Sequence, residues 1–314
     1  MSGGLGPVAG GPGGPGGPWV VAVGGGHGLS STLKAVRRYA GRLTAVVSVA
    51  DDGGSSGRLR ATTGLPAPGD LRRCLVALAD SGSLWARAME HRFVGGDLDG
   101  HALGNLIIAG LAEVTGDFGA ALDAASALLG VSARVLPATE GPVTLKGSAA
   151  GHEIVGQVNV QESVQPVTEV SVEPAGAPAP PEAVEAIAAA DQVILGPGSL
   201  FTSVLAACVV PAVRGALASR AGGTVLVVNL RPQVPETAGL SPAAHLRTVL
   251  DHGVRVDTTL VDAAWPPEGP ELEGLKRVAA AAGVRLLRAE VGRPGRDGHD
   301  PERLAVALSA LLPG

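Results

Sequence analysis

Cysteine is nearly absent from this sequence, because its 314 residues include only Cys74 and Cys208. Each lies in an apolar stretch with no second Cys or His at ligand spacing, so no metal–thiolate site is indicated. Two buried thiols in a reducing compartment are the favoured interpretation, while a lone disulfide between them stays open. A chain of this length can bury a core without cross-links.

Basic charge and aromatic side chains are also scarce. The formal net charge is −5, only 2% of the residues are aromatic, and basic residues gather only in short pairs such as Arg37-Arg38 and Arg72-Arg73. A nucleic-acid partner is therefore disfavoured, because no broad positive field would hold its phosphates and few rings would stack on its bases.

Long hydrophobic runs are missing as well. A run such as Ala102 to Ala112 is interrupted by Gly104 and Asn105, and it is shorter than the roughly 20 residues that a bilayer requires. Residues 1–18 are mostly Gly and Pro and lack the basic and apolar regions of a signal peptide, which predicts a disordered tail. The sequence thus predicts a cytoplasmic protein without a membrane span, with one folded domain over residues 19–314.

From Trp19 onward, short β-branched runs alternate with longer Ala/Leu-rich periodic segments. This alternation predicts an α/β fold with a Rossmann-like, mostly parallel sheet flanked by helices. Strands are expected at Trp19–Val23, Leu43–Val49, Gln192–Leu195, Thr224–Asn229, Thr258–Val261 and Val284–Leu287. Residues 131–173 instead predict a small antiparallel β insertion, with strands at Val131–Leu136, Val143–Leu145, Glu153–Val160 and Val167–Val172.

The helices expected between the strands and after them follow the apolar periodicity. They are Ser30–Ala40, Asp70–Ala79, Leu84–Arg92, Gly104–Thr115, Phe118–Leu129, Pro181–Ala190, Leu200–Ala207, Pro211–Ser219, Pro242–His252, Leu272–Ala281 and Pro301–Leu311.

The first predicted strand ends in a glycine-rich turn that leads directly into a helix. The turn reads Gly24-Gly25-Gly26-His27-Gly28-Leu29-Ser30. A strand, a glycine turn and a helix aim free main-chain N–H groups and a positive helix end at a phosphate. The turn is neither a strict G-x-G-x-x-G nor a Walker A loop, and a tight connection is the alternative. Phosphate or nucleotide binding is favoured because the flanking elements are correct.

The second predicted strand ends in two carboxylates, Asp51 and Asp52, followed by a flexible Gly/Ser loop that reaches Arg58. A Rossmann unit places a ribose-binding carboxylate at about this distance after the first loop. The same oxygens could instead hold Mg²⁺ against phosphates, or one Asp could cap a turn.

Two further segments carry polar side chains at helix starts. Asp70 follows Pro68 and Gly69 and is predicted first as an N-cap and second as a ligand contact. His101 is most simply structural, whereas Asn105, within an apolar helix start, calls for a polar partner.

Two later strands end in the same manner. Gly196-Pro197-Gly198-Ser199 leads to Thr202 and Ser203, and Asn229 leads to Gln233, Glu236 and Thr237. Because ligands of open α/β sheets collect at the carboxyl ends of strands, these loops are expected to border one cleft with the first loop.

Together, the motifs G-G-G-H-G-L, V-A-D-D-G-G-S-S-G-R-L-R, P-G-D-L-R-R-C-L-V-A-L, G-H-A-L-G-N-L, L-P-A-T, L-G-P-G-S-L-F-T-S and N-L-R-P-Q-V-P-E-T resemble the YvcK group of the YvcK/CofD-like family, the gluconeogenesis factors. The resemblance runs from about Trp19 to His252. It implies a Rossmann-like protein that binds a nucleotide sugar of the UDP-N-acetylglucosamine type and supports cell shape and wall synthesis during gluconeogenic growth.

The resemblance also implies the residues that contact the nucleotide. They are Gly24, Gly25, Gly26, His27, Gly28, Leu29, Asp51, Asp52, Asn105, Gly196, Pro197, Gly198, Ser199, Thr202, Ser203, Asn229, Gln233, Glu236 and Thr237. The sequence departs from the family at Gly298-His299-Asp300, where an arginine commonly precedes the histidine; Arg296 is a candidate substitute.

No Ser-His-Asp order, catalytic cysteine setting or zinc pattern is present, so nucleophilic catalysis has no support. The leading hypothesis is a regulator that binds a nucleotide sugar, and the sequence assigns no cofactor to it. The alternative, implied by the CofD branch, is a transferase that joins a phospholactyl group to a deazaflavin from a guanylyl-activated donor, with Mg²⁺ at Asp51 or Asp52. A regulatory protein partner and a homo-oligomer are both compatible with the sequence, and neither is specified by it.

Overall fold

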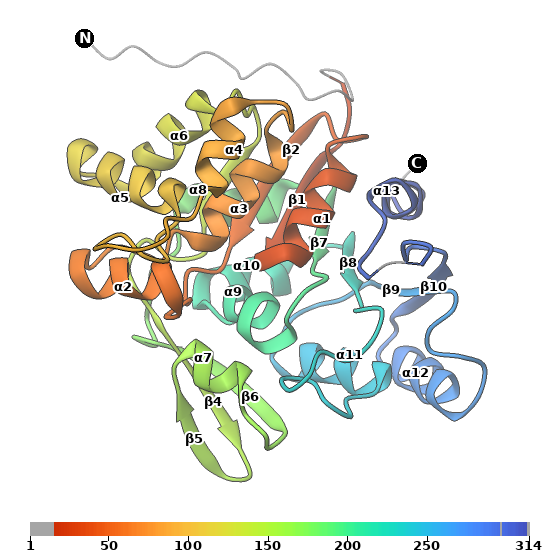
Figure 1. Ribbon diagram of the computed structural model, residues 1–314. Coiled ribbons are helices and arrows are strands. Elements are labelled where there is room, and N and C mark those ends of the chain that lie inside the picture. The colour runs from red at the N-terminus through yellow and green to blue at the C-terminus, as the bar shows by residue number, and fades with distance from the viewer. Residues whose placement is uncertain (1–15, 296, 313–314) are drawn as a thin grey trace.

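The structure is a computed structural model that describes residues 16–295 and 297–312. Seven parallel strands form the main sheet in the order β10-β9-β8-β7-β1-β2-β3 (Figure 1), which confirms the predicted α/β class. The strands are β1 Trp19–Gly24, β2 Arg42–Val47, β3 Arg134–Pro137, β7 Gln192–Leu195, β8 Thr224–Val227, β9 Thr258–Asp262 and β10 Arg285–Ala289. The predicted tail, residues 1–18, lies outside the described residues except for 16–18.

Helices cover both faces of this sheet (Figure 1). On one face α1 packs against α3 and α13, and on the other α8 packs against α10. The helices are α1 Gly26–Val36, α2 Gly54–Thr63, α3 Gly69–Leu78, α4 Leu84–Glu90, α5 Leu103–Thr115, α6 Phe118–Leu128, α7 Gln157–Gln161, α8 Pro181–Ala189, the π-helix η1 Leu200–Leu205, α9 Ala206–Cys208, α10 Pro211–Ser219, α11 Pro242–Asp251, α12 Pro270–Ala281 and α13 Pro301–Ser309.

The central strands are buried on both sides, as strands of a covered parallel sheet must be. Every residue from Val20 to Gly24, and every residue of β7 and β8, is buried. Valine fills these strands because its branched side chain packs well on a pleated surface. Strand order reverses at β1, which pairs with β2 on one side and with β7 on the other. The cleft of a doubly wound sheet forms at such a reversal.

The predicted antiparallel insertion is confirmed as a separate three-stranded sheet in the order β5-β4-β6. Its strands are β4 Thr144–Ala149, β5 His152–Val155 and β6 Val167–Glu173. One expected member is wrong: the strand predicted at Val131–Leu136 is β3, which pairs parallel to β2 at the edge of the main sheet. A short run such as Val131–Leu136 does not by itself distinguish an edge strand of the main sheet from a hairpin strand.

The strand predicted at Glu153–Val160 is also wrong in its second half. The strand ends at Val155, and α7 begins at Gln157 after Gly156, which has a φ of 102°. The side chain of Asp52, far away in sequence, accepts hydrogen bonds from Gln157 N and Val158 N. A helix start stabilised from another element leaves no local pattern to recognise.

The segment after β2 forms helix α2, where the sequence predicts a flexible loop. Glycine and serine at its start are poor helix formers, and few apolar residues mark a buried face, so periodicity gives no helix signal. The helix ends at Gly64 in the left-handed conformation that glycine adopts readily. In addition, α1 begins at Gly26 rather than Ser30, which places His27 and Gly28 inside its first turn.

Within residues 16–295 and 297–312, no single helix is long and apolar enough to cross a membrane. The bent pair Leu200–Cys208 and Pro211–Ser219, with 77° between its parts, would qualify only by length and composition.

Both cysteines are buried free thiols, so they should be unreactive in the native protein. Burial raises the pKa of Cys208 to about 12 and the pKa of Cys74 well above its usual value, and the thiolate is the reactive form. We expect no rapid reaction of the native protein with a chromogenic disulfide at neutral pH, and reaction of both thiols after denaturation. A thiol that reacts in the native state at the rate of a free thiol would contradict this packing.

Candidate functional site

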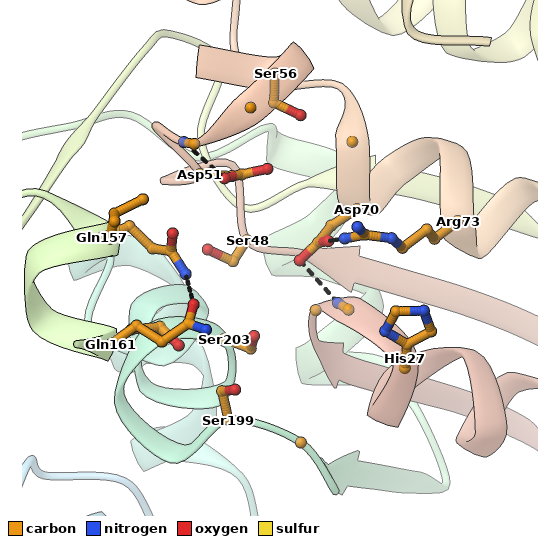
Figure 2. A pocket seen from close by; sticks show the side chains of 18 of the residues that line it. His27, Ser48, Asp51, Ser56, Asp70, Arg73, Gln157, Gln161, Ser199 and Ser203 are labelled. Carbon is orange, nitrogen blue, oxygen red and sulfur yellow. Dashed lines mark hydrogen bonds and ion pairs between the residues drawn. The ribbon is translucent and has the colours of Figure 1, made fainter. Parts of the chain in front are cut away.

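A cavity of about 420 Å³ opens at the carboxyl ends of β1, β2 and β7 (Figure 2). Its walls are the loop after β1, the segment from β2 into α2, the start of α3, and the loop from β7 into η1. The insertion supplies another wall, because Gln157, Val158 and Gln161 of α7 line the cavity. Figure 2 shows Gln157 and Gln161 on the side opposite His27 and Arg73. The site is therefore shared between the main sheet and the insertion.

Helices α1, α2, α3, α7 and η1 begin at this cavity, and none has a capping side chain at its own N-cap position. By contrast, Ser or Asp side chains cap α4, α6, α11 and α13, and α8, α10 and α12 begin with proline. First-turn N–H groups have no partner within their helix. Carboxylates from other elements accept some of them, namely Asp70 at α1, Asp52 at α7 and Glu236 at η1. The remaining first-turn donors and the positive dipole ends favour an anion in the cavity.

Asp70 interacts with the start of α1, so its prediction as the N-cap of α3 is wrong. Pro68 is the N-cap of α3, and Asp70 lies in the first turn. Asp70 Oδ2 accepts a hydrogen bond of 2.7 Å from Gly26 N, and Oδ1 accepts one of 2.6 Å from Arg73 (Figure 2). This orientation is favourable because the positive N-terminal end of α1 attracts the carboxylate of Asp70.

Glu236 stabilises the start of η1 in a similar way. Its buried Oε1 accepts hydrogen bonds from Phe201 N at 2.9 Å, Thr202 N at 2.8 Å and Thr202 Oγ1 at 3.1 Å. Burial raises the pKa of Glu236, although these hydrogen bonds oppose the rise. Glu236 therefore positions Thr202 and Ser203 along the cavity without lining it.

The adjacent carboxylates Asp51 and Asp52 point in different directions. Asp52 binds Gln157 N at 2.9 Å and Val158 N at 3.0 Å, which fastens α7 to the main sheet. Asp51 lines the cavity and accepts a hydrogen bond from Gly53 N at 3.0 Å. Burial raises the pKa of Asp51, and the negative charge of Asp70 raises it further. Asp51 is thus the carboxylate of this pair that is placed to meet a ligand.

A polar network behind the cavity explains Asn105 and His101. Asn105 Oδ1 accepts from Arg72 Nε at 3.0 Å, and its Nδ2 donates to Ser55 Oγ at 3.1 Å. His101 Nδ1 lies 3.1 Å from Ser55 Oγ, while its Nε2 accepts from Arg58 Nε at 3.1 Å.

The Ser55–His101 pair is part of this network. Arg58 can only donate, so its contact calls for an unprotonated Nε2 on His101. Ser55 Oγ accepts hydrogen bonds from Asn105 Nδ2 and from Ala102 N, which fill its two lone pairs. Burial and the nearby Arg58 lower the pKa of His101, which favours the neutral ring. Both side chains are thus held by structural partners.

The two glycine loops are packed directly against each other. A Cβ at Gly28 would lie 2.1 Å from Pro197 O, so only glycine allows this approach. Asn229 Oδ1 accepts from Gly198 N at 2.9 Å, and its Nδ2 donates to Gly198 O at 2.8 Å and to Gln233. Thr237 Oγ1 accepts from Gln233 N at 2.7 Å. Asn229 and Thr237 thus hold the loops that line the cavity.

The structure brings many of the predicted residues to one place. The cavity is lined by Gly25, Gly26, His27, Gly28, Asp51, Asn105, Gly198, Ser199, Thr202, Ser203 and Gln233. The other predicted residues support it from outside the lining: Gly24, Leu29, Asp52, Gly196, Pro197, Asn229, Glu236 and Thr237. Leu29, for example, belongs to the hydrophobic core.

Sequence reasoning missed several lining residues, namely Ser48, Ser55, Ser56, Arg72, Arg73, Arg92, Gln157 and Gln161. Arg72 and Arg73 lie in the same motif as Asp70, and their proximity to that acidic residue was the available signal. Gln157 and Gln161 gave none, because the fold alone brings the insertion to the cleft. At the other end of the chain, His299 is buried away from the cavity, and burial lowers its pKa to about 4. Arg296 lies outside the described residues.

Comparisons with known proteins match this arrangement along most of the chain. The profile of the CofD family, described as 2-phospho-L-lactate transferase CofD, matches residues 20–284. A relative from Mycobacterium tuberculosis, named within the gluconeogenesis factors, is 44% identical over 93% of this chain and 90% of its own. The gluconeogenesis factor of Halalkalibacterium halodurans is 40% identical over 74% of this chain and 73% of its own.

A solved structure is also similar. The crystal structure of a member of the UPF0052 family from Bacillus halodurans superposes with a TM-score of 0.85 and 33% sequence identity. The match covers 92% of this chain and 98% of that one.

The contact between the glycine loops predicts that Gly28→Ala destabilises the protein by about 1–3 kcal/mol, because a methyl group must displace main-chain atoms of Pro197. Gly110→Ala is the matched control, since nothing lies within 4 Å of a Cβ at this exposed position of α5. It should instead gain up to about 1 kcal/mol through helix propensity. Denaturant unfolding measures both, and equal effects of the two substitutions would contradict the close packing.

The environments of the paired carboxylates predict opposite responses to amide substitution. The folded pKa of Asp51 is raised, so its ionised form is penalised above that pKa and the penalty disappears as the pH falls toward the unfolded pKa. Asp51→Asn should therefore raise the free energy of unfolding at neutral pH, with a smaller gain in acid.

Asp52→Asn is the control for this prediction, because it removes a charge from two N–H donors of α7. It should cost about 1–3 kcal/mol at neutral pH. The measurement is denaturant unfolding across the acid range, and a loss of stability for Asp51→Asn at neutral pH would show that its burial is not the dominant effect.

Proposed function

The chain belongs to the CofD family, within the group of gluconeogenesis factors, and we propose that its cavity binds a nucleoside diphosphate sugar of the UDP-N-acetylglucosamine type. The observation that carries this proposal is the convergence of the starts of α1, α2, α3 and η1 on one cavity, where Asp70 and Glu236 use only part of the first-turn N–H groups. A diphosphate offers several oxygens at the spacing of neighbouring main-chain donors, and helix starts are recurrent phosphate sites. Asp70, bound to Gly26 N, already demonstrates that a negative group is stable beside α1.

The remaining lining suits the uncharged parts of such a ligand. Gln157, Gln161 and Gln233 provide amides, and Ser199 and Ser203 provide hydroxyls. Such groups donate and accept hydrogen bonds without changing charge, as recognition of sugar hydroxyls and base edges requires. The cavity, at about 420 Å³, falls within the range of small-molecule sites. Further ligand atoms would extend toward the open side.

The site supports binding more clearly than turnover. Ser55 and His101 are held in a network with Ala102 N, Asn105 and Arg58, and His27 is the imidazole among the described residues that line the cavity. We infer that occupancy of the site reports the supply of wall precursors to a protein partner. A protein with this role would support cell shape and wall synthesis when the cell grows on gluconeogenic carbon.

A second candidate function rests on the pair Asp51 and Asp70. Both carboxylates line the cavity, and the charge of Asp70 raises the pKa of Asp51. Mg²⁺ is commonly held by one or two carboxylates together with substrate phosphates, so these residues fit the metal, whereas Asp52 is occupied by α7. With the ion present to offset phosphate charge, the cleft would serve a CofD-like transferase that moves a phospholactyl group to a deazaflavin.

Calorimetric titration with UDP-N-acetylglucosamine and with GDP, each with and without Mg²⁺, separates the two functions. The regulator predicts UDP-sugar binding that does not depend on the metal. GDP preference with a Mg²⁺ requirement would replace it by the transferase, and no binding of either nucleotide would refute both.

The insertion provides a sharper version of the same test. Replacing the lining amides in Gln157→Ala/Gln161→Ala should weaken UDP-N-acetylglucosamine binding by about tenfold, the effect of losing one or two hydrogen bonds. The matched control is Gln165→Ala, an exposed position beyond α7 that does not line the cavity. Unchanged affinity in the double variant would place the ligand away from the insertion and sink this assignment of the site.

A further inference from the structure

A second, larger hollow adjoins the cavity on the side of α1, α3 and α4. Its volume is about 1260 Å³, and it shares His27, Arg72, Arg73 and Arg92 with the cavity. We call it the basic groove, because its lining includes seven cations: Lys34 of α1, Arg37 and Arg38 directly after α1, Arg72 and Arg73 of α3, Arg87 of α4, and Arg92 after α4. The shared residues make the groove continuous with the cavity.

The basic groove is strongly positive, although the chain as a whole carries a net negative charge. Seven of the 24 Lys and Arg residues line it against two acidic residues, Asp80 and Glu90, whereas the whole chain has a formal charge of −5. Like charges in one concave site repel one another and destabilise the fold unless an anion offsets them. A solvated protein surface alone does not require this arrangement.

Arg72 provides an independent sign of a missing anion. Its side chain is buried, with a residue exposure of 5%, and it lines both the cavity and the basic groove. The Arg72 guanidinium donates hydrogen bonds to two neutral oxygens, Asn105 Oδ1 and Met89 O. No carboxylate among the described residues forms an ion pair with it. Burial lowers the pKa of Arg72 to about 10. Buried charges in proteins are normally paired, so a guanidinium in this position is suited to an anion from outside the chain.

The ends of the groove carry cations that are available to a ligand. Lys34 and Arg87 are exposed in the last turns of α1 and α4, and neither side chain forms a hydrogen bond or an ion pair within the described part of the chain. Arg37 and Arg38 are partly engaged, with carbonyls of Leu78 and Ala79 and with Glu302. The free cations thus lie at the rim, and the buried one lies where the groove meets the cavity.

We propose that the basic groove binds a second ligand, a multiply charged oxyanion of the oligophosphate class, beside the nucleotide. Guanidinium groups match phosphate oxygens in a two-pronged geometry, and cations distributed along a groove suit an extended chain of phosphates better than a single one. The proposed nucleotide uses main-chain donors of the helix starts in the adjoining cavity, whereas the second ligand uses the cations of the groove. The second ligand is separate from the proposed nucleotide-sugar site and does not require it.

The test uses inorganic tripolyphosphate as the probe, titrated calorimetrically into the full chain at low salt. Lys34→Ala/Arg87→Ala should weaken tripolyphosphate binding by at least about tenfold while leaving UDP-N-acetylglucosamine affinity within about twofold, because neither residue lines the cavity. Both residues are exposed, so the variant should fold. Added salt should weaken binding further by screening the charges.

The matched control is Arg247→Ala/Arg277→Ala, which removes two exposed cations from α11 and α12, outside the groove. It should bind tripolyphosphate as the unmodified protein does. Equal loss in both double variants, no loss in either, or complete displacement of tripolyphosphate by UDP-N-acetylglucosamine would overturn the proposal. A protein that binds tripolyphosphate in the groove but no nucleotide sugar would refute the proposed function alone.

Discussion

The reversal of strand order at β1 is the constraint on which the site depends. Because β1 lies between β2 and β7, right-handed crossovers carry the following helices to opposite faces of the sheet. The starts of α1 and η1 therefore meet at one edge, and the chain crosses there at main-chain contact distance between Gly28 and Pro197. No side chain fits at this crossing. The glycines are required first for packing, and the exposed donors of α1 are a consequence of that packing.

The main sheet was largely predictable from the sequence, because its central strands are short, buried and apolar and are followed by glycine or polar turns. The loops after β1 and β7 were expected to border one cleft for the same reason, and residues of both line the cavity. Elements formed through distant contacts were not predictable. Helix α7 depends on a carboxylate more than a hundred positions earlier, α2 lacks an apolar periodicity, and β3 reads locally like a hairpin strand. Residues such as Gln157 entered the site only through those contacts.

Acidic residues near the cleft illustrate how a local pattern can indicate the right place and the wrong role. Asp52 and Glu236 were expected to contact the ligand, and each instead accepts hydrogen bonds from the first turn of a helix. Asp70 was expected to cap α3, but it accepts a hydrogen bond from Gly26 N in the first turn of α1. In each case a positive helix end attracts the nearest carboxylate, and only the fold determines which one is nearest. Asp51, which accepts one main-chain hydrogen bond and has a raised pKa, faces the cavity together with Asp70.

The attachment of α7 has a thermodynamic consequence for the whole insertion. Its wall of the cavity is joined to the main sheet through Asp52, so any molecule that contacts both walls adds cross-links between two parts of the chain. A ligand that binds only the assembled site stabilises that assembly by mass action. An outside partner that holds the three-stranded sheet in place would therefore increase the affinity of the cavity for such a ligand. By reciprocity, the ligand would increase the affinity for that partner by the same factor. The exposed surface of the three-stranded sheet is thereby coupled to whether the cavity is occupied.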